Sequence, residues 1–339
     1  SIVTGYSVDA VLNHASLVAA GKSLASGNDV RVVYWNGAAW VELDRVLDTA
    51  SSWNNATTTL WFKTQAAIGT NTFDDNYYIY YGNSAAGAPP ANADNVFLMF
   101  DDFNGAALDG TKWTVPTGSV SVAGGLLTVN ANSTVWATAA YSLATGTRWE
   151  ARLRLSIANP ATLYYWGGSD VNGQTGSYFS FRSDGANHRA YEHPNGGGTS
   201  TSTAAVTNTT TLQTYQIDRI GNAQLDFGEN GTVLRSYTNA NVPTASVRPF
   251  LSGNSATETH TYDWVRIRYF VSAEPNPSLN AVESYAPLAW WQFDETTWSN
   301  TPNQVLDASG NGHPLTPFSG PVTAAASPAL TGSPGTWRA

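Results

Sequence analysis

The chain has 339 residues and a net charge of −9, from 16 Lys and Arg against 25 Asp and Glu. This charge and the lack of a basic cluster argue against binding along a nucleic-acid backbone, and no run of about 18 apolar residues suggests membrane insertion. The absence of cysteine excludes disulfides, thiolate nucleophiles and cysteine-ligated zinc. Charged residues make up only 12% of the chain, a low share that favours an extracellular protein.

Alternating apolar and polar residues dominate the sequence and predict an all-β protein. Three segments near the start read as strands or hairpins: 29–46, 57–64 and 76–83. The first contains Asn36-Gly37, a dipeptide typical of a tight hairpin turn. Only residues 14–25 show a modest helical pattern, and Gly21 interrupts it.

Two stretches rich in proline and small residues, 84–95 and 272–284, divide the chain. Between them, turn signals separate short strands every ~8–12 residues, which is the spacing of a β-sandwich or jelly roll. The last segment has one clear strand, at 288–295, and is too short to form a stable sandwich alone. The predicted organisation is a first domain, a second domain, a linker and a partial segment: 1–95, 96–272, 273–284 and 285–339.

The stretch "SGNDVRVVYWNGAAWVELDRVLD", followed by "DDNYYIYYGN", resembles the DUF2341 family of bacterial surface proteins. The hallmark of that family is a strand that ends in Tyr-Tyr-Gly-Asn, here Tyr80, Tyr81, Gly82 and Asn83. The resemblance covers about residues 5–100 and implies a β-sandwich at the start of the chain.

The middle of the chain, about residues 97–272, resembles concanavalin A-like lectins and glucanases, which are jelly rolls. The resemblance is carried by "FDDFNGAALDGTKWTV", "VAGGLLTV", "RWEARLRL" and "YDWVRIRYF". The tail, "LAWWQFDETTW" and "QVLDASGNGH", is similar to the first strands of a LamG-type domain. The implied fold class is all-β: a β-sandwich followed by a concanavalin A-like jelly roll, with a short C-terminal LamG-like segment. This order resembles large bacterial surface proteins, including pilus-associated ones.

Asp101 and Asp102 end an apolar run, and the first of three interpretations is catalysis. Glycosidases use two carboxylates that flank the scissile bond, and glucanases of the resembling fold carry Glu-x-Asp-x-x-Glu along one strand. No predicted strand here has acids at alternate positions, and Glu150 is followed at alternate positions by arginines. We therefore expect no enzyme and no catalytic residues, with a glycoside hydrolase kept as a minor alternative.

The second interpretation is a structural calcium ion, which takes six to eight oxygen ligands. In the resembling jelly rolls such an ion ties the first strand to the last. The resemblance implies Asp102, Gly125 and Asp263 as the metal ligands. A carboxylate on a half-buried strand, such as Asp263, needs a partner in any case.

The third interpretation is that Asp101 and Asp102 only cap turns and pair with Arg266 or Arg268. A second oxygen-rich loop, residues 307–313, matches the front half of a calcium-binding loop but lacks its closing Glu. We expect that loop to be a polar turn.

Two aromatic segments, "ATLYYWGGSD" and "GSYFSFRSDGANHRAYEH", form the predicted ligand-binding region. Strand alternation should place Tyr164 and Trp166 on one sheet face, with Tyr165 on the other. Sugar rings stack on flat aromatic side chains, and Arg side chains bind their hydroxyls. The predicted ligand-binding residues are Trp166, Tyr178, Arg182, Arg189 and Tyr191. The alternative, that these rings simply pack the sandwich, stays open for each of them.

These observations favour a non-catalytic carbohydrate-binding or surface-binding module of an extracellular bacterial adhesin or appendage protein. The expected partner is a polysaccharide or a cell-surface glycan, and the expected cofactor is structural calcium. The alternative is a structural subunit or tip component of a filament or surface layer, which would bind itself or other subunits by strand addition. Neither function involves nucleic acid or membrane insertion.

Overall fold

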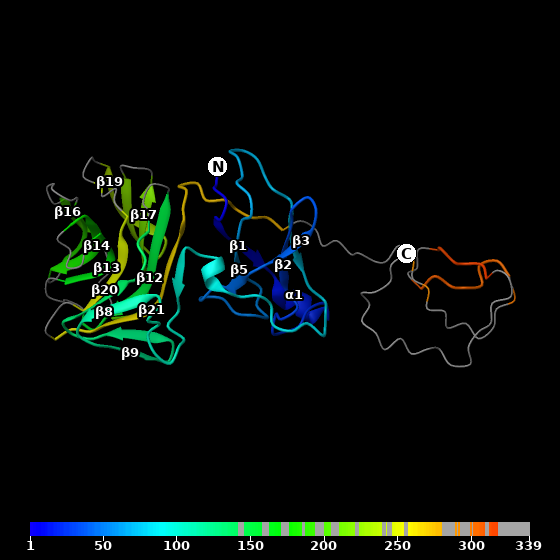
Figure 1. The fold of residues 1–339 in the computed structure, drawn as a ribbon, viewed down its shortest axis with the longest axis horizontal. Coiled ribbons are helices and arrows are strands. Elements are labelled where there is room, and N and C mark those ends of the chain that lie inside the picture. Colours follow the sequence, from blue (N-terminus) through cyan, green and yellow to red (C-terminus); the bar gives the residue numbers. More distant parts are fainter. Residues whose placement is uncertain are drawn as a thin grey trace. The chain divides into compact units, whose positions relative to one another are not determined.

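The computed structural model describes most of the chain (Figure 1). The described residues are 1–141, 146–157, 163–170, 176–184, 187–193, 200–204, 210–220, 224–238, 242, 246–253, 257–279, 289, 291, 299, 301–308 and 312–317. The chain divides into two compact units, Ser1–Leu279 and Asn280–Ala339, and each is described by itself. The structure contains no helix, within these residues, that is long and apolar enough to cross a membrane.

The larger part of the first unit is a sandwich of two antiparallel sheets (Figure 1). In spatial order, the eight-stranded sheet contains β19 (Thr232–Thr238), β18 (Gln224–Glu229), β17 (Gln213–Ile220), β12 (Thr147–Leu155), β21 (His260–Tyr269), β10 (Leu126–Val129) and β9 (Val120–Ala123), with β7 (Met99–Asp101) also paired to β21. The seven-stranded sheet contains β16 (Ser200–Ala204), β15 (Asn187–His193), β14 (Tyr178–Asp184), β13 (Leu163–Ser169), β20 (Arg248–Gly253), β11 (Ser133–Ala137) and β8 (Trp113–Thr117).

The two sheets bury one apolar core between their inner faces. Strand β12 shows the alternation that produces it, because Trp149, Ala151 and Leu153 are fully buried and in the core, whereas Arg148 and Arg152 point out of the sandwich. Burial of such alternate apolar side chains is the main stabilising contribution in a two-sheet fold. The prediction of an all-β protein with a concanavalin A-like jelly roll is confirmed.

The N-terminal part of the first unit is a smaller sandwich of two three-stranded sheets. One contains β1 (Ser7–Leu12), β5 (Thr58–Lys63) and β4 (Arg45–Leu47), and the other contains β3 (Trp40–Leu43), β2 (Arg31–Trp35) and β6 (Tyr77–Tyr80). The predicted hairpin is confirmed, since β2 and β3 pair across Asn36-Gly37 and Gly37 has a φ of +90°. The helical pattern gives only α1 (His14–Ala19), which ends before Gly21, and a 3-10 turn, η1 (Ala93–Asn95), precedes β7.

The Tyr-Tyr-Gly-Asn tetrad has a structural role that centres on the buried carboxylate of Asp29. Its Oδ2 accepts a hydrogen bond from the Gly82 backbone N–H at 2.8 Å, and its Oδ1 accepts bonds from Leu24 N–H and the Ser23 hydroxyl, both at 3.0 Å. Gly82 has a φ of +106°, a conformation that favours glycine. Burial raises the pKa of Asp29, but these hydrogen bonds outweigh burial and hold it below its usual value.

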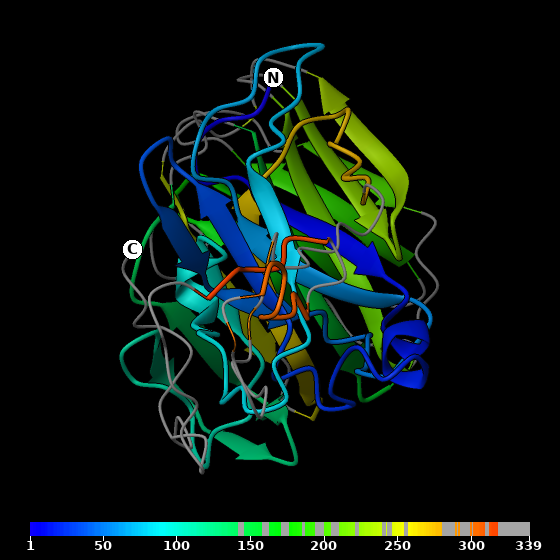
Figure 2. The same ribbon diagram turned by 90° about the vertical axis from the view of Figure 1, so that its right-hand side faces the viewer.

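The N-terminal part, whose first strands are drawn in blue in Figure 2, is joined to the eight-stranded sheet by a buried ion network. Glu150 on β12 accepts hydrogen bonds from Arg266 at 2.6 and 3.1 Å and from Arg268 at 3.4 Å. From the N-terminal part, Asp48 accepts a bond from Arg266 at 3.2 Å, and the Trp61 ring lies 4.6 Å from the Arg266 guanidinium carbon. This surface of the eight-stranded sheet is therefore an internal joint of the unit.

The same network continues along the sheet through Glu274. Arg268 donates to Glu274 at 2.7 and 3.0 Å, and Arg148 lies 2.8 Å from the same carboxylate. Arg148 also binds Asp218 on β17 through two hydrogen bonds, at 2.6 and 2.8 Å. Paired charges of this kind are tolerated in a buried site only because each has its counter-ion.

In the second unit, isolated bridges join Trp291 to Asp307 and Val305 to Leu315 among the described residues. Most of the predicted strand at 288–295 and three of the seven residues of the predicted polar turn at 307–313 lie outside the described residues. The LamG-like segment therefore stays a prediction.

His260 is a buried base that should make the first unit sensitive to acid. Its Nδ1 donates to the Ser252 carbonyl, and burial lowers the pKa of the ring from 6.5 to about 4. The unfolded chain therefore binds more protons than the folded chain between these values, so stability is complete above about pH 6.5 and is lost as the pH falls towards 4. We expect the free energy of unfolding to decrease by about 3 kcal/mol across this window from His260 alone.

Urea unfolding of the wild type and of His260→Asn at pH 7, 5.5 and 4 measures this contribution. Asn keeps a side-chain N–H for the Ser252 carbonyl but does not titrate. The difference in unfolding free energy between the two proteins should therefore shrink as the pH falls. A difference that does not change with pH would show that His260 does not titrate in this window.

Candidate functional site

Two tyrosines and an arginine form a cluster on the outer face of the seven-stranded sheet. Tyr164 on β13 lies opposite Arg182 on β14, and Tyr178 begins the same β14 strand. The hydroxyls of Tyr164 and Tyr178 are 3.3 Å apart, and their rings meet edge to face with centroids 5.7 Å apart. The Arg182 guanidinium carbon is 5.2 Å from the centroid of the Tyr164 ring. We call Tyr164, Tyr178 and Arg182 the Tyr–Arg cluster.

The outer face continues from this cluster towards β20 and β11. Ser180, between Tyr178 and Arg182 on β14, is fully buried and lies opposite Gly167 of β13. Beyond Gly167, Phe250 pairs with Trp136, and their ring centroids are 5.4 Å apart. Small residues thus separate two aromatic groups on one sheet face. Phe250 and Trp136 are buried and are not among the predicted binding residues, although both alternate with core residues on their strands.

Trp166, the expected stacking platform, is instead a core residue. Tyr164 opposes Arg182 while Trp166 opposes Phe181, so β13 has one extra residue, Tyr165, against β14. This bulge reverses the simple alternation beyond it, and Trp166 is fully buried in the core. The expectation that Trp166 shares the outer face with Tyr164 is corrected accordingly, and the core-packing alternative holds for this ring.

Two further predicted binding residues, Arg189 and Tyr191, lie on β15. Their backbone positions are described: Arg189 pairs with Arg182 and Tyr191 pairs with Ser180. The register therefore continues the row of the Tyr–Arg cluster onto β15. Their side chains lie outside the described residues, so their part in binding stays a prediction.

The adjacent aspartates of the early turn act as turn caps. Asp101 accepts hydrogen bonds from the Phe103 backbone N–H at 2.9 Å and from the Trp113 indole N–H at 2.7 Å. Burial raises the pKa of Asp101. Asp102 bonds both the backbone and the side chain of Asn104, at 3.3 and 2.7 Å. The capping role expected for both residues is thus observed.

The expected pairing of Asp101 or Asp102 with Arg266 or Arg268 is not found among the described contacts. Those two arginines bind Glu150 and, between them, two other carboxylates. The aspartates sit at the end of β7, where backbone and indole N–H groups satisfy them. The arginines sit in the joint to the N-terminal part, which the sequence alone did not reveal.

The three predicted calcium ligands are only partly brought together. Gly125 has a φ of +73°, and a Cβ placed there would lie 2.7 Å from Asn104 Oδ1. Because Asn104 also bonds Asp102, the side chain of Asn104 links Asp102 to the Gly125 turn. Asp263 accepts a hydrogen bond from Arg152 at 2.7 Å and so already has a counter-ion. The described residues contain no group of three or more His, Cys, Asp or Glu side chains arranged for a metal.

Glu150, the acid considered for catalysis, is held as an anion. Burial alone would raise its pKa, but Arg266 and Arg268 outweigh burial and lower the pKa to about 2. A general acid must hold a proton near neutral pH. Glu150 is therefore a structural counter-ion for the two arginines.

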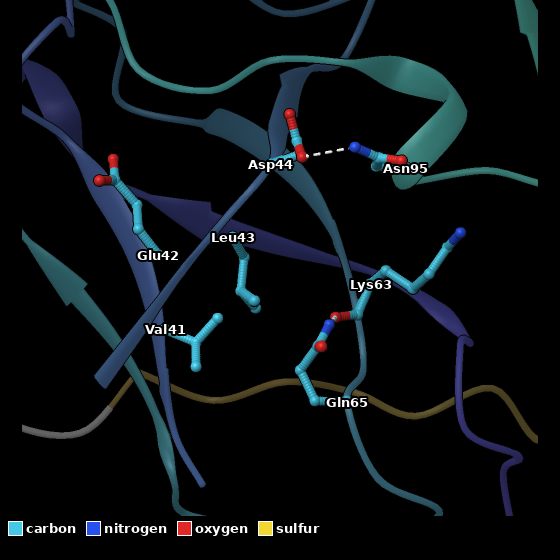
Figure 3. A pocket seen from close by; sticks show the side chains of 7 residues that line it. All are labelled: Val41, Glu42, Leu43, Asp44, Lys63, Gln65 and Asn95. Atoms are coloured by element: carbon cyan, nitrogen blue, oxygen red, sulfur yellow. Dashed lines mark hydrogen bonds between the residues drawn. The ribbon is translucent and has the colours of Figure 1, made fainter. Parts of the chain in front are cut away.

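A separate open hollow of about 380 Å³ lies beside the edge strand β3 (Figure 3). It is lined by Val41, Glu42, Leu43, Asp44, Lys63, Gln65 and Asn95. The Asp44 carboxylate accepts hydrogen bonds from the Asn95 side-chain amide at 2.9 Å and from the Asn92 backbone N–H at 2.6 Å. None of these described lining residues is aromatic, which makes the hollow a poorer fit to a sugar ring than the sandwich face.

Several solved structures with jelly-roll folds are distantly similar to this chain. One, of endo-acting O-glycanases expressed by human gut bacteria to initiate mucin breakdown, is 15% identical over 52% of this chain and 100% of its own, with a TM-score of 0.43. An endo-β-1,3-glucanase from Pyrococcus furiosus is 15% identical over 52% of this chain and 95% of its own, with a TM-score of 0.43. An antigen and pseudo β-1,3-glucanase of Mycobacterium tuberculosis is 17% identical over 52% of this chain and 99% of its own, with a TM-score of 0.42.

So distant a likeness does not transfer the function of those proteins to this chain. A search of curated proteins found no sequence match. The family model that matches is Domain of unknown function (DUF2341), over residues 26–116. Its matched range begins before β2 and ends within β8 of the seven-stranded sheet. Residues 26–116 are thus a DUF2341 domain whose last part supplies β7 and most of β8 to the jelly roll.

Proposed function

We propose that this chain is a non-catalytic carbohydrate-binding module of an extracellular bacterial surface protein, such as an adhesin or appendage. The single observation that carries the proposal is the Tyr–Arg cluster on the outer face of the seven-stranded sheet. Tyr164 and Arg182 are half-buried at this face, and the buried Tyr178 ring packs edge to face against the Tyr164 ring. The ligand is a polysaccharide or cell-surface glycan.

The chemistry of the face supports binding rather than cleavage. Hydrolysis of a glycosidic bond uses two carboxylates on opposite sides of that bond. The alternate outward positions of β14 carry Tyr178, Ser180 and Arg182 instead. Two buried acids of the other sheet, Glu150 and Asp218, support the same conclusion because both are bound to arginines.

Substitutions in the Tyr–Arg cluster should weaken glycan binding without unfolding the protein. We expect Tyr164→Ala and Arg182→Gln each to raise the dissociation constant about tenfold, because each removes a direct contact to the ligand. Pull-down with cellulose, chitin, β-1,3-glucan and mucin would find the ligand, and calorimetry would give the affinity.

Arg235→Gln is the matched control, because Arg235 is an exposed arginine on β19 of the other sheet. It should bind like the wild type, and melting temperatures should confirm that all variants are folded. Wild-type affinity in both cluster variants, or binding to none of the four polymers, would contradict the proposal. Release of reducing ends from the bound polymer would contradict its non-catalytic part.

Calcium at the Asp102 corner is the second part of this proposal. Oxygens of Asp102, Asn104 and Gly125 would supply ligands, with Asp263 exchanging Arg152 for the ion. We expect EDTA to lower the melting temperature by several degrees and added calcium to restore it, because an ion bound only to the folded chain stabilises it. Asp102→Asn should melt at the lower temperature with or without calcium. A wild-type melting temperature that does not respond to EDTA would exclude the ion.

A further inference from the structure

The outer face of the β3–β2–β6 sheet carries four exposed or half-buried aromatic rings. Trp40 is at their centre: its ring centroid lies 5.1 Å from Trp35, 5.0 Å from Tyr78 and 6.2 Å from Tyr80. Trp40 is 51% exposed and Tyr80 is 39% exposed. We call Trp35, Trp40, Tyr78 and Tyr80 the aromatic platform.

Strand alternation explains why these rings face water. On β2 and β6, Val32 and Ile79 point into the small N-terminal core, and so do the neighbouring Tyr34 and Tyr77. The residues that alternate with them, which include Trp35, Tyr78 and Tyr80, therefore point outward. The outward rings do not pack in the core. An exposed cluster of aromatic rings is typical of an interaction surface.

One ion pair lies on the same face as the platform. Arg31 Nε is 2.8 Å from Glu42 Oε1, and Arg31 also donates to the backbone carbonyls of Asn28 and Gly87, at 2.6 and 2.8 Å. The two side-chain charges cancel, so this face has no net charge with which to attract a polyanion or a polycation. The pair nevertheless presents polar atoms at the edge of the rings.

We propose that the aromatic platform is a second carbohydrate-binding site, and that it takes a neutral polysaccharide. A sugar ring has an apolar C–H face that packs on a flat aromatic ring and hydroxyls around its rim that reach polar groups. The platform offers both features, with Trp40 as the stacking surface and the Arg31–Glu42 pair at the rim. The site lies on the DUF2341 domain and does not rest on the Tyr–Arg cluster of the jelly roll.

The test uses the whole chain carrying Tyr164→Ala and Arg182→Gln, so that binding at the proposed sandwich site does not mask the platform. Affinity electrophoresis runs this protein through gels that contain β-1,3-glucan, xyloglucan, galactomannan or the polyanion polygalacturonate. We expect a neutral polymer to retard it and polygalacturonate not to do so. Adding Trp40→Ala or Tyr80→Ala should weaken the retardation about tenfold.

Phe73→Ala is the matched control, because Phe73 is 85% exposed in the same N-terminal part but makes none of the ring contacts of the platform. It should leave retardation unchanged. The proposal is overturned if no neutral gel retards the protein, if only the polyanion does, or if Trp40→Ala migrates like its parent. It is also overturned if sedimentation shows a dimer that Trp40→Ala dissociates without any retardation, since the platform is then an interface between copies. The parent with an intact Tyr–Arg cluster, run alongside, tests the sandwich site separately.

Discussion

The arrangement of the first unit depends on one buried ion pair system, in which Glu150 lies between Arg266 and Arg268. Removing charges from water is costly, so each must keep its partner for the fold to be stable. Asp48 and Trp61 of the N-terminal part contact Arg266, so the N-terminal part packs against this region of the sheet. The DUF2341 match runs through this junction into β7 and β8, as expected if the two sandwiches form one structural unit.

This constraint also separates the two surfaces of the jelly roll by chemistry. Around β12 and β21, the outer face of the eight-stranded sheet is filled with paired charges and serves as a joint. The outer face of the seven-stranded sheet instead carries hydroxyls, rings and a guanidinium in the Tyr–Arg cluster. A ligand that loses bound water and gains stacking contacts and hydrogen bonds suits the outer face of the seven-stranded sheet. It does not suit the outer face of the eight-stranded sheet. The aromatic platform presents a similar mixture of rings and polar atoms on the other domain.

Much of the fold follows from local patterns in the sequence. The Asn36-Gly37 hairpin, the alternation along β12 and the turn-capping aspartates depend on neighbours close in the chain, so their residue types predict them. The bulge at Tyr165 could not be predicted, because an inserted residue leaves no recognisable pattern in a run of aromatic residues. The bulge places Trp166 in the core instead of on the outer face. Glu150 and Asp48, two carboxylate partners of these arginines, lie more than a hundred residues away in sequence, so local patterns did not predict the pairing. The aromatic platform could have been predicted, because strand alternation along β6 places Tyr78 and Tyr80 on the outer face of the sheet. The family resemblance does not single out these two residues.

We propose that the outer face of the seven-stranded sheet binds a glycan without cleaving it. Hydrogen–deuterium exchange of the whole chain, with and without its strongest polysaccharide ligand, measures where that ligand lies. Slower exchange should be concentrated in β13 and β14, around residues 163–169 and 178–184, while the polymer keeps its length. Protection confined to other strands, or a polymer that shortens during the incubation, would contradict the account.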